Sequence, residues 1–118
     1  MEEAHVLVIE PNATHARMLN VALHIAGFHV TLASDGTQAL RHLSHASFSA
    51  VVLDLSMPDA QSIKVLRQLQ RDAKMDSVFW MVISTRDAAD IRDLYGPLGD
   101  HFMGKPFNPW ELVGRLRK

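Results

Sequence analysis

The sequence predicts an α/β protein built on a parallel sheet. Short apolar runs alternate with amphipathic helical patterns five times along the chain, and the runs lack the polar alternation of half-exposed strands. Strands of this kind are buried on both faces, as they are when helices cover both sides of a parallel sheet. The chain has no internal repeat, long linker or low-complexity segment, so its 118 residues predict a single domain, 1–118.

The predicted strands are apolar runs of four to six residues, a common length for strands. The third run is apolar at every position before it reaches Asp54, and the fourth is equally apolar before Ser84. Both should therefore be covered on both faces. The five predicted strands are residues 5–9, 28–33, 50–53, 78–83 and 101–104.

The first two helical segments are marked by apolar stripes and by residues at their ends. Residues 12–26 place apolar side chains at helical spacing, and Gly27 follows where a C-terminal cap is expected. Asp35 and Gly36 open the second helix, which carries its apolar residues over 39–43. Each helix directly follows a predicted strand, which is the order of a βα unit.

The other three helical segments have equally clear boundaries. Residues 61–71 carry apolar side chains at helical spacing, and residues 88–94 are followed by a Gly-Pro pair that ends the helix. The last helix begins at Asn108, a cap residue, with proline in the first turn and Glu111 at the third position. The chain is therefore five successive βα units.

Right-handed crossovers leave few arrangements for five such units. The flavodoxin-like order 2-1-3-4-5 places the first and third strands side by side at the point where the strand order reverses. Glu10 should then lie beside Asp54, and Ser84 and Lys105 should approach the same edge. Two acids, a hydroxyl and an ammonium at one edge suit the making and breaking of an acyl phosphate on a carboxylate.

The composition excludes several classes of function. Hydrophobic residues make up 47% of the chain, too many for a disordered protein, and the net charge of −1 argues against direct nucleic-acid binding through bulk charge. The chain has no cysteine, which excludes disulfides and thiolate metal sites. Its longest apolar run has six residues, and its start is acidic where a signal peptide is basic. We therefore expect a cytoplasmic protein without a membrane partner.

The residues at the strand ends give the chain a resemblance to response-regulator receiver domains of the CheY-like superfamily. The resemblance covers the whole chain, and the spacing fits that family: 44 positions from Glu10 to Asp54, 30 more to Ser84 and 21 more to Lys105. Any one of these positions is weak evidence, whereas all of them in register on five βα units are specific. The matching elements are Glu10, the run Leu53-Asp54-Leu55-Ser56-Met57-Pro58, Ser84-Thr85, Phe102 and Lys105-Pro106-Phe107.

The resemblance implies a role for each position. Asp54 would accept a phosphoryl group from a histidine kinase or a histidine phosphotransfer protein, a transfer that needs positioning and charge neutralisation. Lys105 would pair with the carboxylate and then with a phosphoryl oxygen. In the family, the peptide bond from this lysine to the following proline is cis. Ser84 and Phe102 would act as the switch. Thr85 and Arg86 are candidate modulators of the phosphorylation site.

The resemblance also implies the partners. A receiver is a phosphoacceptor and not an enzyme in the ordinary sense, although it can catalyse its own phosphorylation and dephosphorylation. Its common output surface comprises the fourth helix, the fifth strand and the fifth helix. That face would bind a downstream effector domain or protein, or a second copy of the chain as a homodimer.

Pro11 is the main departure from the family pattern. Receivers usually carry two adjacent acids after the first strand, and here the pair reads Glu10-Pro11. By the register of the family, proline stands where an acid binds magnesium directly, and proline offers no side-chain oxygen. The remaining Mg²⁺ ligands would be Asp54, the backbone carbonyl of Ser56, and Glu10, directly or through water. We expect Mg²⁺ binding to be weakened.

Other interpretations differ in what they require of the site. A flavodoxin-type FMN protein needs a glycine- or hydroxyl-rich phosphate loop after the first strand, which is acidic here. A phosphatase of the haloacid dehalogenase type needs a second Asp where Ser56 stands. His42 and His45 lack a third metal ligand. The main alternative is a phosphorylation-independent receiver that acts as a protein-interaction module. Pro11 favours it, whereas the joint retention of Asp54, Ser84 and Lys105 argues against it.

Overall fold

The structure is a computed structural model that describes residues 4–56 and 59–117. Its five strands form one parallel sheet in the order β2-β1-β3-β4-β5, which confirms the predicted flavodoxin-like topology. Among the described residues, no helix is long and apolar enough to cross a membrane. The strands are β1 (His5–Ile9), β2 (His29–Ala33), β3 (Ala50–Asp54), β4 (Phe79–Ser84) and β5 (Phe102–Gly104).

Five α-helices connect and follow these strands, as predicted. Two short 3₁₀ turns, which the sequence did not predict, precede β4 and β5 at residues 73–75 and 99–101. The second turn delays the start of β5 by one residue from the predicted position. The helices are α1 (Ala13–Ile25), α2 (Gly36–His45), α3 (Ala60–Arg71), α4 (Ala88–Tyr95) and α5 (Pro109–Leu116).

Each α-helix starts with an Asp or Asn whose side chain accepts a hydrogen bond from a backbone N–H in the first turn. Asn12 Oδ1, for example, accepts from His15 N at 3.0 Å. Such caps satisfy amides that have no partner within the helix, and they fix the residue at which the helix begins. The remaining caps are Asp35, Asp59, Asp87 and Asn108.

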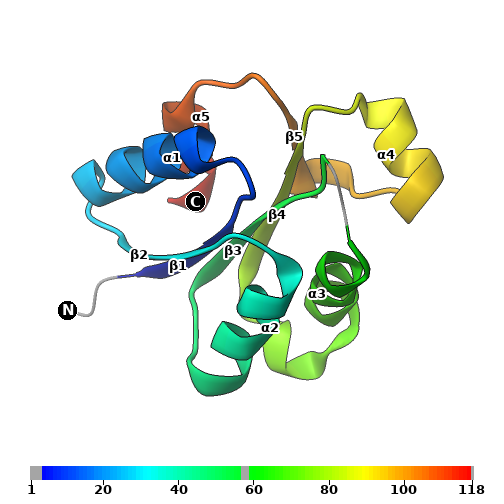
Figure 1. Ribbon diagram of the computed structural model, residues 1–118, viewed down its shortest axis with the longest axis horizontal. Helices are drawn as coiled ribbons and strands as arrows, with labels where there is room; N and C mark the ends of the chain where they lie inside the picture. The colour runs from blue at the N-terminus through cyan, green and yellow to red at the C-terminus, as the bar shows by residue number, and fades with distance from the viewer. Residues whose placement is uncertain (1–3, 57–58, 118) are drawn as a thin grey trace.

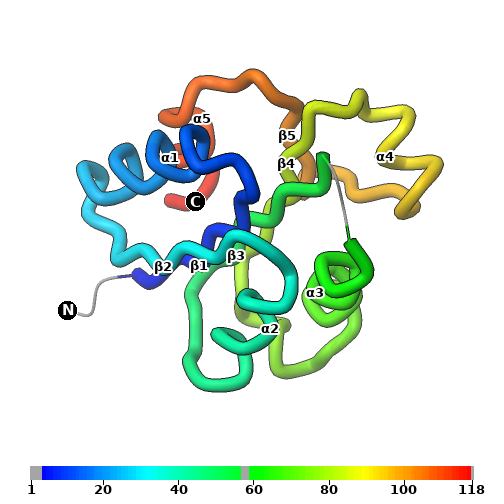
Figure 2. Tube along the Cα trace, in the orientation of Figure 1, coloured from blue at the N-terminus to red at the C-terminus, as the bar shows by residue number. Residues whose placement is uncertain are grey.

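The helices cover both faces of the sheet. Helices α1 and α5 lie next to each other on one face, and α2, α3 and α4 cover the other (Figure 1). The tube view shows the same division, with the chain crossing from one face to the other after β2 and before α5 (Figure 2). Each face has its own core: Leu19, Leu23 and Leu112 belong to the first, and Leu66 and Ile91 to the second.

The strand register aligns the ends that carry polar residues. Ile9 pairs with Leu53 across β1 and β3, so Glu10 and Asp54 follow at the same edge. Ser84 pairs with Gly104 across β4 and β5, so Lys105 leaves the sheet beside Ser84. The backbone N–H of Lys105 donates to the carbonyl of Ser84 at 2.7 Å. Four polar residues from four strands therefore meet at the carboxyl edge of one sheet.

Candidate functional site

Two buried carboxylates form the centre of the site. Glu10, directly after β1, is 3% exposed, and Asp54, the last residue of β3, is 4% exposed. Both follow strands that are almost wholly buried, so the sheet carries the carboxylates into the interior. Ionised carboxylates removed from water are costly unless they are paired and hydrogen-bonded, so the groups that contact them define the chemistry of the site.

Lys105 supplies the charge that these carboxylates need. Its side chain is only 9% exposed, and its Nζ lies 2.6 Å from Asp54 Oδ2 and in hydrogen-bond contact with Glu10 Oε1. The ammonium bridges two acids that are 44 residues apart in the chain. With both acids ionised, the cluster has a net charge of −1, and one cation serves both. The peptide bond from Lys105 to Pro106 is cis, as the resemblance implied.

Ser56 holds the Asp54 carboxylate from the other side. Its backbone N–H donates to Asp54 Oδ1 at 2.8 Å, and its hydroxyl donates to Oδ2 at 3.2 Å. The same hydroxyl accepts from the N–H of Thr85 at 2.9 Å. The sequence indicated only the carbonyl of Ser56; its hydroxyl links the carboxylate to the β4–α4 loop. Met57 and Pro58 of the same motif lie outside the described residues.

His15 also belongs to the site, and the sequence reasoning missed it. Its Nδ1 lies 3.1 Å from Lys105 Nζ and 3.9 Å from Glu10 Oε1. An ammonium group can only donate, so Nδ1 of His15 is the acceptor in its contact with Lys105. The sequence did hold a signal for His15: the cap at Asn12 places residue 15 in the first turn of α1, shortly after Glu10.

Ser84 lies at the end of β4 and is fully buried. Its hydroxyl oxygen accepts from the backbone N–H of Arg86 at 3.0 Å, which leaves its own hydrogen available to donate. The side chain of Arg86 turns toward β3, where its Nε donates to the carbonyl of Ser56 at 3.2 Å. Both residues at the start of the β4–α4 loop, Thr85 and Arg86, therefore contact Ser56.

Phe102 does not join the carboxylate site. It lies at the start of β5, packs against the core beneath α4, and lines a cavity of about 350 Å³ between α4 and β5. Ala88, Ile91 and Leu98 also line this cavity. Of the predicted site residues, the structure brings Glu10, Asp54, Ser56, Ser84, Thr85, Arg86 and Lys105 together and places Phe102 on the α4 side of the sheet.

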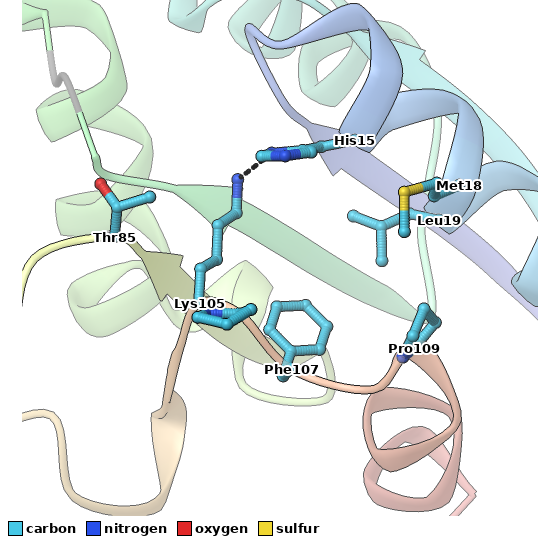
Figure 3. Close-up of a pocket in the computed structure, with 8 residues that line it drawn as sticks. His15, Met18, Leu19, Thr85, Lys105, Phe107 and Pro109 are labelled. Atoms are coloured by element: carbon cyan, nitrogen blue, oxygen red, sulfur yellow. Dashed lines mark hydrogen bonds between the residues drawn. The ribbon is translucent and has the colours of Figure 1, made fainter.

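A pocket of about 240 Å³ opens beside Lys105 and His15. Figure 3 shows Lys105 extending from the loop after β5 toward His15, with Thr85 on one side and Met18 and Phe107 on the other. The walls are mostly apolar, and Lys105, which lines the pocket, is also the residue that contacts the two buried acids.

The oxygen atoms of the site are of the kind that Mg²⁺ binds. Glu10, Asp54 and the Ser56 carbonyl are hard oxygen donors, which fit magnesium chemistry. Pro11 adds no donor, and Asn12 and Asp59 use a side-chain oxygen each to cap a helix. Among residues 4–56 and 59–117, no group of three or more histidine, cysteine or acidic side chains is arranged to hold a metal ion. The donor set therefore fits the ion in type.

Comparison with known proteins agrees with this geometry. The model of the response regulator receiver domain family matches residues 6–117. The DNA-binding response regulator MtrA of Mycobacterium tuberculosis is 35% identical over 112 residues, which is 95% of this chain and 48% of MtrA. The uncharacterized transcriptional regulatory protein YkoG of Bacillus subtilis is 30% identical over 118 residues, 99% of this chain and 51% of YkoG. The chain thus spans about half the length of these curated relatives.

Solved structures give the same result. The receiver domain of the Francisella response regulator 1452 superimposes with a TM-score of 0.79 at 25% identity, over 98% of this chain and 94% of that one. The family match extends over nearly the whole chain and includes every strand end that carries a polar residue of the site. The chain therefore belongs to the receiver domain family of two-component response regulators.

Proposed function

We propose that Asp54 accepts a phosphoryl group from a phosphohistidine on a histidine kinase or a histidine phosphotransfer protein. Receiver domains of response regulators in general are phosphorylated and switch partners. The observation that carries the proposal for this chain is the buried Asp54 carboxylate paired with Lys105 Nζ at 2.6 Å, next to an open pocket. A carboxylate with no chemical role would gain nothing from burial at a strand end, because its desolvation is costly.

The proposed transfer needs no further reactant. A carboxylate oxygen of Asp54 attacks phosphorus, the P–O bond forms as the P–N bond of the phosphohistidine breaks, and the electron pair leaves on the imidazole nitrogen, which takes up a proton. Lys105 would neutralise the charge on the phosphoryl oxygens, and positioning supplies most of the remaining catalysis. Hydrolysis by water reverses the modification. The domain thereby promotes its own phosphorylation and dephosphorylation without turning over a separate substrate.

Receiver domains generally bind Mg²⁺ at the acidic pocket. In this chain, Glu10, Asp54 and the carbonyl of Ser56 would hold the ion, and the ion would supply positive charge to the phosphoryl oxygens. We propose that binding is weak, because Pro11 provides no oxygen and Lys105 already contacts both carboxylates. Replacing Pro11 by Asp should tighten Mg²⁺ binding measured by calorimetry without any phosphodonor, and an unchanged affinity would argue against a missing ligand at this position.

The switch would operate through Ser84 and Phe102. The Ser84 hydroxyl has a hydrogen to donate, and donating it to a phosphoryl oxygen would move the β4–α4 loop toward Asp54. Phe102 borders the cavity between α4 and β5, so it has space into which its ring can turn when that loop moves. The affected surface comprises α4, β5 and α5, where an effector or a second copy of the chain would bind. This is a two-state element biased by a local charge.

The output of the domain is also part of the proposal. MtrA is described as a DNA-binding response regulator, and this chain matches about half of it. We propose that any DNA contact belongs to an effector domain or partner and not to this domain, whose net charge is −1. Response regulators are typically cytoplasmic proteins, and we propose the same location here.

Intact mass after incubation with acetyl phosphate and Mg²⁺ tests the proposed phosphorylation. A single adduct of about 80 Da, one phosphoryl group, is expected in the wild-type chain and not in Asp54→Asn. An adduct that persists in Asp54→Asn would assign the modification elsewhere. No adduct in either protein, with acetyl phosphate or with a panel of histidine kinases, would favour the alternative of a receiver that signals by binding alone.

A further inference from the structure

Arg86 makes a contact that the proposed phosphorylation chemistry does not use. It lies in the loop between β4 and α4, and its Nε donates to the backbone carbonyl of Ser56 at 3.2 Å. Its own backbone N–H donates to Ser84 Oγ at 3.0 Å. One residue therefore holds both the carbonyl that follows Asp54 and the hydroxyl at the end of β4. The Arg86 side chain is a permanent cation, because guanidinium does not lose its proton in proteins.

Hydrogen bonds of Ser56 itself hold this residue close to Asp54. The backbone N–H and the hydroxyl of Ser56 both donate to the Asp54 carboxylate, at 2.8 and 3.2 Å, and the hydroxyl accepts from Thr85 N at 2.9 Å. These three hydrogen bonds hold Ser56 beside Asp54. The guanidinium of Arg86 therefore contacts the carbonyl of a residue that is anchored to Asp54, and this is the same carbonyl that the proposed Mg²⁺ site requires.

We propose that Arg86 is a built-in cation that competes with the divalent ion for the Ser56 carbonyl. The inference rests on the proposed Mg²⁺ site and adds a regulator to it. Two positive groups close to one oxygen repel each other, and although Arg86 is exposed, the repulsion acts over the short distance between two ligands of the same atom. A metal ion that binds this carbonyl must therefore displace the Arg86 side chain. By linkage, removing that side chain must favour the ion.

The charge balance of the site points in the same direction. Glu10 and Asp54 contribute two negative charges, and Lys105 already neutralises one of them. Arg86 adds a second cation at the edge of this cluster, on the side of β3 and β4. The four groups together have a net charge of zero when both acids are ionised. A site neutralised by its own side chains attracts a divalent ion less than one that keeps an excess of carboxylate.

A magnesium titration of the unphosphorylated chain tests the inference. We expect Arg86→Ala to bind Mg²⁺ roughly fivefold or more tightly than the wild type by calorimetry, a size typical of coupling between neighbouring sites. Arg92→Ala is the matched control, because Arg92 is an exposed arginine on α4 and its removal changes the net charge equally. Its effect on affinity should be much smaller. An Arg86→Ala affinity equal to or weaker than that of Arg92→Ala would overturn the inference.

A second measurement needs no substitution and so does not depend on how the variants fold. Hydrogen exchange of the Arg86 Nε–H, followed by NMR on the wild-type chain, should accelerate when Mg²⁺ is added, because the guanidinium is released to water. The Arg92 signal should not change. Unchanged exchange of Arg86 at saturating Mg²⁺ would overturn the inference, as would a complete lack of Mg²⁺ binding in every variant.

Failure of this inference can be told apart from failure of the proposed function. Both measurements are made without a phosphodonor, so they report on the ion and Arg86 alone. If the wild-type chain gives no mass adduct but the Arg86→Ala variant binds Mg²⁺ more tightly than the wild type, the inference is supported and the proposed phosphorylation is contradicted. A chain that forms the adduct but shows no effect of Arg86 would support the phosphorylation and contradict the inference.

Discussion

Lys105 illustrates how much one residue contributes to the site. Its ammonium contacts Asp54 Oδ2 and Glu10 Oε1, and it donates to His15 Nδ1 as well. Three donors of one ammonium group thus serve three acceptors from two strand ends and a helix. Loss of Lys105 would remove the cation that contacts both carboxylates directly. The stability of the unphosphorylated domain and its proposed chemistry therefore depend on the same side chain.

Replacing Lys105 by Met should lower the free energy of unfolding by roughly 3 kcal/mol, because it removes the ammonium that contacts both buried carboxylates. Urea unfolding at pH 7.5 is the measurement. Asp54→Asn is the control: the Lys105–Glu10 pair is kept, so we expect a much smaller change. Wild-type stability in Lys105→Met would show that water reaches the carboxylates and that the ion pairs contribute little to folding.

At the scale of elements, α2 and α3 are in close contact at Gly36. Among the glycines that the structure describes, only this one lies so near another helix. A Cβ added to Gly36 would lie 2.2 Å from Ser62 N and 2.4 Å from the carbonyl carbon of Gln61. These are backbone atoms in the first turn of α3, so no side chain can move to make room. Gly36 therefore allows the first turns of the two helices to touch, close to the loop that leads from Asp54 into α3.

The variant Gly36→Ala should lose about 1–3 kcal/mol of stability, the usual cost of forcing extra volume into a packed contact. Gly114→Ala is a suitable control, since Gly114 lies in α5 with nothing within 4 Å of an added Cβ. There alanine should stabilise the helix by up to about 1 kcal/mol. Chemical denaturation of both variants gives the comparison, and equal stabilities would contradict the tight contact between α2 and α3.

At the scale of the whole molecule, the two ends of the sheet have different electrostatics. The carboxyl edge holds the acids and Lys105, whereas the amino edge holds a cluster around His5. His5 Nε2 lies 2.7 Å from Thr31 Oγ1, and its ring contacts those of His29 and Phe48 at centroid distances of 4.8 and 4.7 Å. Burial lowers the pKa of His5 from its ordinary value, and the charges of His29 and His42 lower it further.

This lowered pKa makes stability depend on pH. Below an ordinary histidine pKa of about 6.5, the unfolded chain takes up a proton at His5 that the folded chain does not, so stability should fall as pH drops from about 6.5 toward the lowered value. Above that range His5 is neutral in both states and contributes no slope. Thermal unfolding between pH 7.5 and 5.5 measures this decline.

The variant His5→Gln should flatten the decline, whereas His24→Gln, which changes an exposed histidine on α1, should leave it in place. The comparison concerns the slope of stability against pH and not its absolute level, because glutamine also changes the contact with Thr31. A slope in His5→Gln as steep as that of the wild type would assign the acid sensitivity to other groups.

The sequence by itself determined the order of elements, the parallel sheet and the residues at its carboxyl edge. Hydrophobic runs and helix caps are local signals, and strand order follows from chain handedness, so Glu10, Asp54, Ser84 and Lys105 could be placed together in advance. The start of β5 was less predictable, because the turn before it is set by a distant contact. His101 Nδ1 lies 2.8 Å from the carbonyl of Trp80, and the two rings stack at 3.8 Å.

Only the tertiary structure decided which side chains complete the site. The contact of His15 with Lys105 spans 90 positions in the chain, and that of Arg86 with Ser56 spans 30. The sequence marked Arg86 as a candidate modulator and placed His15 in the first turn of a helix, but it could not give their partners, because such contacts depend on side-chain reach across loops that the sheet brings together. Local physics therefore fixed the acids and the lysine, while the packing of distant loops fixed the contacts of His15 with Lys105 and of Arg86 with the Ser56 carbonyl.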